Sequence, residues 1–369
     1  MRLRSTTAVV SVVALAVVAP PGVRPAGAHT PGQGADPSAD RVLNLALQGS
    51  RTVGYEGTQS VTIHSPRGVE SERLHVVRGT NDRLVIQAGA GSGGGGWTFF
   101  QDGQRRVVMD PQGGAVSQGH AGLAADIEPD SSLRQMRAKY GVTLEGPTRM
   151  LDREAWTLRI ERSGDARLVE RWTVDARTGL VLGRDSYDGT GGVERSIVFT
   201  EVREPYTPPD SELEPPGHAT APPPASQRWF TQPEASRLAA AQRLPSSLPG
   251  SYLLRSGSSF KVDRASVVQL VYSDGLQEVS LFDQPGKLAG SWLPPGARRI
   301  KLRHGPGFAW EGFPRGTAWQ AGPDTCTLVG ASPADELAQM ADSLPQAPFR
   351  RTLRQRLSHV VDWLRSRLT

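Results

Sequence analysis

Few residues of this sequence are spaced for chemistry. Gly89 to Gly94 match the glycine pattern of dinucleotide-binding loops, but they lie between two predicted strands, so no helix N-terminus follows that could receive a phosphate. His64 and His75 could meet across a hairpin, but two histidines without a third ligand make a poor metal site. Asp175 and Gly179, between two apolar strands, are typical of a turn. We therefore predict no catalytic residue, no metal site and no cofactor.

A second group of residues is suited to binding. Cationic residues alternate with apolar ones in the run from residue 298 to 304. This pattern suits a surface that binds an acidic partner, and it equally suits a strand whose basic face is exposed to solvent. The predicted partner-binding residues are Arg298, Arg299, Lys301 and Arg303.

Charge and cysteine content narrow the class of protein. The formal net charge is +5, from 42 Lys and Arg against 37 Asp and Glu, but the excess is concentrated in the two ends of the chain. Nucleic-acid binding needs a basic face on a folded domain, so we expect none. The one cysteine, Cys326, excludes a disulfide framework and predicts a buried, inert thiol.

The first 28 residues have the pattern of a secretory signal peptide. Arg2 and Arg4 precede an apolar run of about 12 residues, and Ala26-Gly27-Ala28 offers small residues for cleavage. The run is short of the ~20 residues that span a bilayer, although an uncleaved anchor stays an alternative. We expect an exported protein in the periplasm or the extracytoplasmic space of the cell envelope.

Residues 38–203 are predicted to form the first domain. A short helix from about Ala39 to Gln48 precedes many strands with alternating apolar residues, and a second helix is expected from Ser132 to Tyr140. Two helices are too few to sandwich so many strands, so the fold class is α+β with a curved antiparallel sheet over helices. The sheet leaves an apolar groove, unless the helices fill it. The predicted groove residues are Trp97, Phe99, Trp156, Leu158, Ile160, Trp172, Ile197 and Phe199.

Three further segments complete the chain. Residues 204–247 are rich in proline and predict an extended linker, with a possible short helix near Pro233 to Arg243. Residues 248–345 predict a small α+β domain. Residues 349–369 predict a basic amphipathic helix that lies on an anionic membrane, docks into a partner or packs on its own domain.

Stretches in both predicted domains resemble the MucB/RseB family of exported regulators of envelope-stress sigma factors. The matching stretches are Ser50 to Thr58, Tyr140-Gly141 through Ala155, Trp172 to Leu182, Phe199 to Glu201, Leu248 to Tyr252, and Val271 to Phe282 with its Tyr272-Ser273-Asp274-Gly275-Leu276 core.

This resemblance implies a first domain folded like the lipoprotein carrier LolA, an open half-barrel over helices, followed by a small second domain. It implies binding of the extracytoplasmic part of a membrane anti-sigma factor, protection of that factor from proteolysis, and release triggered by lipid-like ligands. A lipid or lipoprotein carrier that uses the same groove is the first alternative. A hydrolase on an unfamiliar scaffold is the second.

Overall fold

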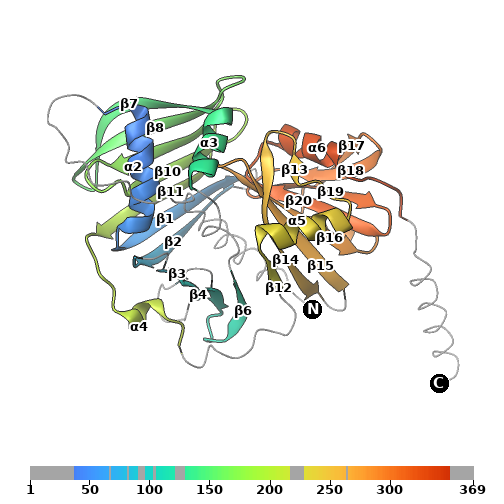
Figure 1. Cartoon of the computed structure of the whole chain (residues 1–369), viewed down its shortest axis with the longest axis horizontal. Helices are drawn as coiled ribbons and strands as arrows, with labels where there is room; N and C mark the ends of the chain where they lie inside the picture. The colour runs from blue at the N-terminus through green and yellow to red at the C-terminus, as the bar shows by residue number, and fades with distance from the viewer. Residues whose placement is uncertain are drawn as a thin grey trace.

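We describe the protein from a computed structural model. The structure describes residues 37–65, 68–80, 83–89, 96–102, 105–120, 129–216, 228–262 and 265–349. The predicted signal peptide and the predicted basic tail beyond residue 349 lie outside this part of the chain. Two antiparallel sheets stand side by side, each with its own helices (Figure 1). We call residues 37–216 the N-terminal unit and residues 228–349 the C-terminal unit.

The N-terminal unit contains one sheet built from two meanders. Strands β1 to β6 and strands β7 to β11 each follow one another in the sheet, and the pairing of β1 with β11 joins the two series. The edge strands β6 and β7 do not pair with each other, so the sheet stays open. The strands are β1 Tyr55–Ser65, β2 Gly68–Arg78, β3 Arg83–Ala88, β4 Trp97–Asp102, β5 Arg105–Met109, β6 Ala115–His120, β7 Tyr140–Met150, β8 Arg153–Arg162, β9 Leu168–Asp175, β10 Val181–Tyr187 and β11 Val193–Arg203.

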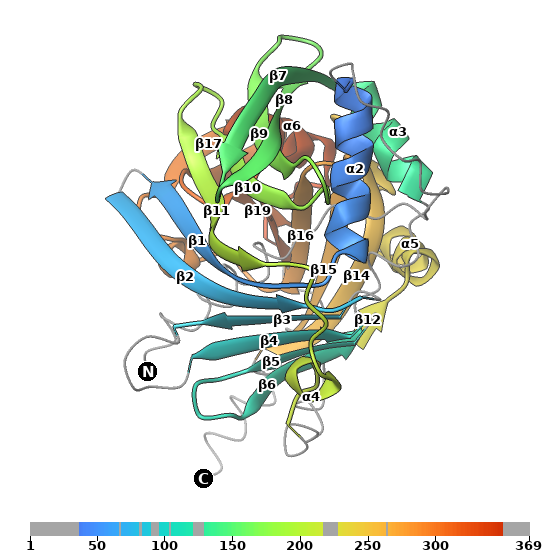
Figure 2. The same cartoon turned by 90° about the vertical axis from the view of Figure 1, so that its left-hand side faces the viewer.

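Helices α2 (Ala39–Thr52) and α3 (Pro129–Lys139) lie on one face of this sheet, which we call the inner face. Ser38 caps α2 by accepting a hydrogen bond from the Arg41 backbone N–H at 3.2 Å. Val42, Leu43 and Ala46 on the apolar stripe of α2 are buried against strands β7 to β10. Figure 2 shows α2 across these strands, while β1 and β2 curve away from them. The predicted curved, open antiparallel sheet with few helices is confirmed.

The turn between β9 and β10 fixes the position of α2. Asp175 Oδ1 accepts hydrogen bonds from the backbone N–H groups of Arg177 and Thr178, which confirms the predicted turn. Gly179 follows with a φ of +75°, and its backbone touches α2 so closely that a Cβ would lie 2.2 Å from the Leu45 carbonyl oxygen.

The substitution Gly179→Ala is therefore expected to lower the free energy of unfolding by about 2–4 kcal/mol, because the new methyl group meets backbone atoms in an already strained conformation. Chemical denaturation followed by circular dichroism measures the change. The control is Gly322→Ala, where φ is +70° but no atom lies within 4 Å of the added Cβ. Equal losses for both variants would contradict the close contact with α2.

The C-terminal unit is a smaller α+β structure, as predicted. Its sheet runs in the order β12-β14-β15-β16-β20-β19-β18-β17, with β13 paired to β14. Helices α5 and α6 cover one face, where Leu270, Leu281 and Trp319 meet Leu337 and Ala341. Its elements are β12 Arg228–Phe230, α5 Gln232–Ala241, β13 Ser247–Leu248, β14 Tyr252–Val262, β15 Ala265–Ser273, β16 Glu278–Pro285, η2 Gly290–Trp292, β17 Arg298–Leu302, β18 Gly305–Trp310, β19 Arg315–Ala321, β20 Asp324–Gly330 and α6 Ala334–Ser343.

Much of the predicted 204–247 linker is packed against one unit or the other. The short helix α4 (Asp210–Leu213) buries Leu213 against the first sheet, on a cluster with Val77 and Phe100. After the gap at residues 217–227, Thr231 and Glu234 form a capping box that begins α5, and β12 pairs with β14. The described prolines include Pro209 before α4 and Pro233 at the start of α5, where a missing N–H costs nothing.

Among the described residues, no helix is both long and apolar enough to cross a bilayer.

Candidate functional site

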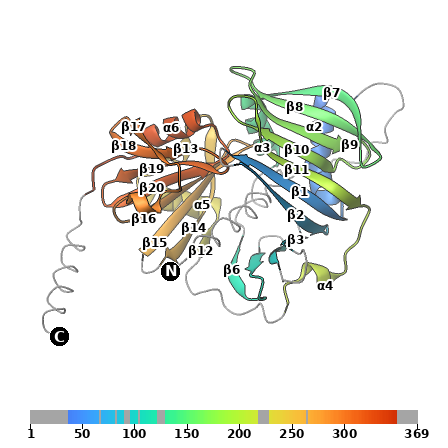
Figure 3. The ribbon, with the colours of Figure 1, turned by 180° about the vertical axis from the view of Figure 1, so that it is seen from behind.

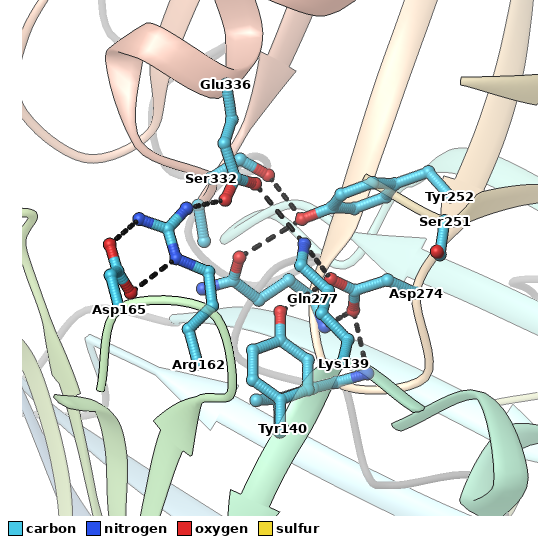
Figure 4. A network of polar contacts seen from close by, with 12 residues as sticks. Lys139, Tyr140, Arg162, Asp165, Ser251, Tyr252, Asp274, Gln277, Ser332 and Glu336 are labelled. Carbon is cyan, nitrogen blue, oxygen red and sulfur yellow. Dashed lines mark hydrogen bonds and ion pairs between the residues drawn. The ribbon is translucent and has the colours of Figure 1, made fainter. Parts of the chain in front are cut away.

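A buried polar network joins the two units (Figure 4). Its centre is Asp274, which has no exposed side-chain surface. The carboxylate accepts hydrogen bonds from Lys139 Nζ at 2.7 Å and from the Tyr140 hydroxyl at 2.5 Å, both supplied by the N-terminal unit. Its second oxygen accepts the backbone N–H groups of Leu276 and Gln277, which holds the turn after β15 in place. We call this network the junction.

Lys139 supplies the ammonium group that pairs with Asp274 in the junction. Its ammonium group also donates to Glu336 of α6 at 3.3 Å and lies 4.4 Å from the centre of the Tyr252 ring. Burial, followed by the charge of Asp274, raises the pKa of Tyr140 well above its usual value, so its hydroxyl remains a donor. A buried charge is tolerated only when it is paired and hydrogen-bonded in this way.

Further contacts extend the junction along the interface. Arg162 of β8 pairs with Glu336 and, at 2.5 Å, with Asp165. Gln135 of α3 donates to the carbonyl oxygens of Ser251 and Ser273, at 2.5 and 2.7 Å. The two units are therefore fixed relative to each other by side chains of α3, β7 and β8.

A second contact between the two units joins the beginning of β11 to β19 and the loop before it. Phe313 packs against an apolar cluster of the first sheet that includes side chains of β1 to β4 and β11, and Arg195 lies 4.7 Å from the centre of its ring. Arg315 pairs with Glu194 at 2.5 Å, and both side chains are almost fully buried. Glu194 lies at an irregularity in the pairing of β11 with β10, since Tyr187 pairs with Val193 and Ser186 with Arg195. We call residues 311–315 with Glu194 and Arg195 the latch.

Burial has a strong effect on Glu194. It raises the pKa of this carboxyl to about 7, against the opposing influence of Arg315. The latch therefore contains a group that titrates near neutral pH.

A cleft of about 880 Å³ opens beside the latch, between the two units. This volume is in the range of ~300–1,000 Å³ that is typical of binding sites. Both units supply its walls, from the ends of β1 and β11 on one side and from β17, β18 and α6 on the other. The lining residues are His64, Ser65, Arg167, Asp188, Gly189, Thr190, Val193, Glu194, Arg298, Ile300, Lys301, Ala309, Glu311, Gly312, Arg315, Pro333, Ala334, Asp335 and Ala338.

The structure divides the four predicted partner-binding residues. Arg298 and Lys301 line the cleft, and Arg298 pairs with Glu311 at 3.1 Å. Arg299 and Arg303 are exposed and are not part of the lining. Ile300 and Leu302 of the same strand pack towards the core, so β17 has the alternation that the sequence indicates.

Strand pairing places the eight predicted groove residues on the inner face of the first sheet. Trp97 is aligned through Ala88, Leu74 and Gln59 with Phe199, and Ile197 is aligned through Arg184 and Trp172 with Leu158. Directly paired residues have their side chains on the same side.

The eight groove residues fall into two clusters with different exposure. Leu158, Ile160 and Trp172 are buried with α2 and α3, together with the half-buried Trp156. These side chains form the core under the helices, because the apolar stripe of α2 covers them. Phe99, Phe199 and the half-buried Trp97 and Ile197 belong to the cluster that Phe313 joins.

His64 and His75 do not meet across the hairpin. His64 pairs with Val69 and His75 with Thr58, so the two histidines lie six positions apart along β1, a distance of about 20 Å. In the part of the chain that the structure describes, no group of three or more His, Cys, Asp or Glu side chains could hold a metal ion.

The junction was not predicted from the sequence as a functional site, although the signal for it was present. Tyr140, Ser251, Tyr252 and the segment Tyr272 to Leu276 are the same residues that carry the family resemblance. They lie far apart in the sequence and meet here in space.

These features define a protein of two antiparallel units that meet through a polar junction and share a cleft. Solved structures with this fold include those of MucB. MucB in complex with MucA(peri) matches with a TM-score of 0.53 and 20% identity over 84% of this chain and 99% of that chain. The MucA/MucB complex of Pseudomonas aeruginosa gives the same values, and MucB alone gives 0.52, 19%, 82% and 96%. The resemblance inferred from the sequence is therefore confirmed at the level of the fold. No protein-family model and no curated protein matches the chain.

Proposed function

We propose that this protein is an exported, non-enzymatic regulator that binds the extracytoplasmic part of a membrane anti-sigma factor. The observation that carries the proposal is the fold of MucB, a protein solved in complex with MucA(peri), together with a cleft of binding-site size between the two units. In this proposal a segment of the partner occupies the cleft, where the two units enclose it and keep proteases from it.

The cleft suits a peptide with both charged and apolar residues. Arg167, Arg298 and Lys301 face it as cations, and Asp188 and Asp335 face it as anions. Val193, Ile300 and Ala338 supply apolar surface between them. Charges at the rim set the rate and specificity of association, while the apolar lining supplies most of the affinity.

We further propose that an apolar ligand controls release through the latch. The half-buried Trp97 and Ile197 on the inner face lie in the same cluster as Phe313. An acyl chain that occupied this place would displace Phe313 and loosen the wall of the cleft that Arg315 and Glu194 form. Mass spectrometry of lipid extracted from the purified protein tests whether such a ligand is present.

The cleft is tested by a pair of charge variants. The double variant Arg298→Ala/Lys301→Ala is expected to weaken binding of the partner segment at least about tenfold, because it removes both cations of β17 that face the cleft. The matched control is Arg299→Ala/Arg303→Ala, which removes the same charge from the same strand outside the lining. Calorimetric titration measures both, with the extracytoplasmic segment of a membrane anti-sigma factor from the same organism as the ligand.

Three outcomes separate the possibilities. A selective loss in the Arg298/Lys301 variant supports the cleft. Equal losses in the two variants would reject the cleft and indicate a general charge effect. No binding by the folded wild-type protein would reject the proposed function.

A further inference from the structure

The connection between β16 and β17 has an unusual course. Strand β16 lies inside the sheet, next to β20, whereas β17 is the edge strand at the far side of β18. Residues 286–297 therefore cross from the middle of the sheet to its edge. Gln320 anchors the beginning of this crossover, since its side chain accepts the Leu288 N–H at 2.8 Å and donates to the Gly286 carbonyl oxygen at 3.0 Å.

The crossover exposes a tryptophan. Trp292, the last residue of η2, has 59% of its surface in contact with solvent. Among the described large hydrophobic residues, only Val69 and Leu253 are comparably exposed. An indole ring has an apolar body and a polar N–H, and it is favoured where apolar and aqueous phases meet.

Cations surround this tryptophan in the sequence. Residues 286–304 contain no Asp or Glu and five Lys or Arg residues. Arg298 pairs with Glu311, whereas Lys287, Arg299, Lys301 and Arg303 are exposed and have no ion-pair partner among the residues that the structure describes. Asp342 is close to Arg303, but its carboxylate accepts the backbone N–H of that residue.

The strand geometry places most of these cations together. Ile300 and Leu302 point to the core of the C-terminal unit. Arg299, Lys301 and Arg303 alternate with them and therefore project from the opposite face of β17. Three exposed cations therefore share one face of β17, and Trp292 precedes this strand by six positions in the sequence.

We propose that Trp292 with Lys287, Arg299, Lys301 and Arg303 forms a contact site for an anionic lipid surface. The indole ring enters the headgroup region, and the cations, none of which must first break an ion pair, lie over the acidic headgroups. This site differs from the cleft, which takes the partner segment, and from the predicted tail helix. Lys301 alone belongs to both surfaces.

The test is co-sedimentation of the full chain with vesicles of phosphatidylcholine alone or with 30% phosphatidylglycerol. The wild-type protein is expected to bind the anionic vesicles and to lose most of this binding at high salt. Arg299→Ala/Arg303→Ala is expected to weaken binding about 25-fold, at about fivefold for each cation. Trp292→Ala is expected to weaken it about tenfold. The predicted tail helix is present in every variant, so differences between variants report this site.

Matched controls use exposed residues elsewhere. Arg134→Ala/Arg237→Ala removes two cations from α3 and α5, and Leu253→Ala removes an exposed apolar side chain. Both are expected to bind vesicles as the wild-type protein does. Unchanged binding by the Trp292 variant, equal losses in the controls, or equal binding to neutral and anionic vesicles would each overturn the proposal. Binding to soluble poly-glutamate but not to anionic vesicles would also overturn it and would identify an acidic polypeptide as the occupant.

Discussion

Asp274→Ala is expected to lower the free energy of unfolding by about 3–5 kcal/mol, because it leaves the buried ammonium group of Lys139 without its closest counter-charge. The Tyr140 hydroxyl and the two backbone N–H groups of the turn lose their acceptor as well. Thermal denaturation by calorimetry measures the loss. Since the junction holds the units together, the wild-type protein is expected to unfold in one transition and the variant in two.

Two further variants identify the cause of this loss. Asp274→Asn keeps the shape and one acceptor oxygen, so its loss is expected to be smaller than that of the alanine variant. Asp102→Ala removes an exposed carboxylate that lies 3.8 Å from Arg83, and it is expected to cost less than about 1 kcal/mol. A loss of that small size for Asp274→Ala would show that the junction does not stabilise the assembly of the two units.

The latch is expected to make stability depend on pH between about 4.5 and 7. The pKa of Glu194 rises from 4.5 to about 7 in the folded protein, mainly because of burial. In this window the folded protein binds more protons than the unfolded chain, so the free energy of unfolding falls as pH rises and levels out above about 7. Glu194→Gln is expected to remove this part of the slope. Urea denaturation at pH 5 and pH 8 measures it.

Removal of the cation of the latch is expected to make the dependence steeper. Arg315→Met leaves Glu194 buried without its partner, which costs about 3–5 kcal/mol at pH 8 and less at pH 5, where the carboxyl binds a proton. The double variant with Glu194→Gln is expected to recover part of the loss. The control is Arg298→Met, whose ion pair with Glu311 is exposed. The same loss at both pH values would contradict a buried carboxylate in the latch.

Local patterns in the sequence were sufficient to predict most of the architecture. Alternation along segments such as Trp156 to Ile160 predicts strands, Ser38 predicts the start of α2, and Asp175 to Gly179 predicts a turn. Each of these signals depends on neighbours within a few residues. The curvature of the first sheet followed from the small number of helices available to cover it.

The functional geometry could not be predicted in the same way, because it depends on pairs of residues that are distant in sequence. Lys139 and Asp274 meet across 135 positions, and neither has a local pattern that names its partner. The prolines after Arg203 indicated an extended linker, yet Tyr206 and Leu213 pack on the first sheet. The apolar alternation could not distinguish Leu158, which α2 covers, from Trp97, which stays half-exposed.

The pairing of β1 with β11, which joins the two meanders, is expected to slow the folding of this chain (Figure 3). Each meander consists of hairpins that can form as soon as they are synthesised, but β1 must wait for a strand that follows it by more than a hundred residues. Contacts of such long range slow folding, since a large loop must close before they give any stability. During synthesis, β1 therefore presents an unpaired edge until residue 203 has emerged, and a chaperone that shields strand edges would act at this stage.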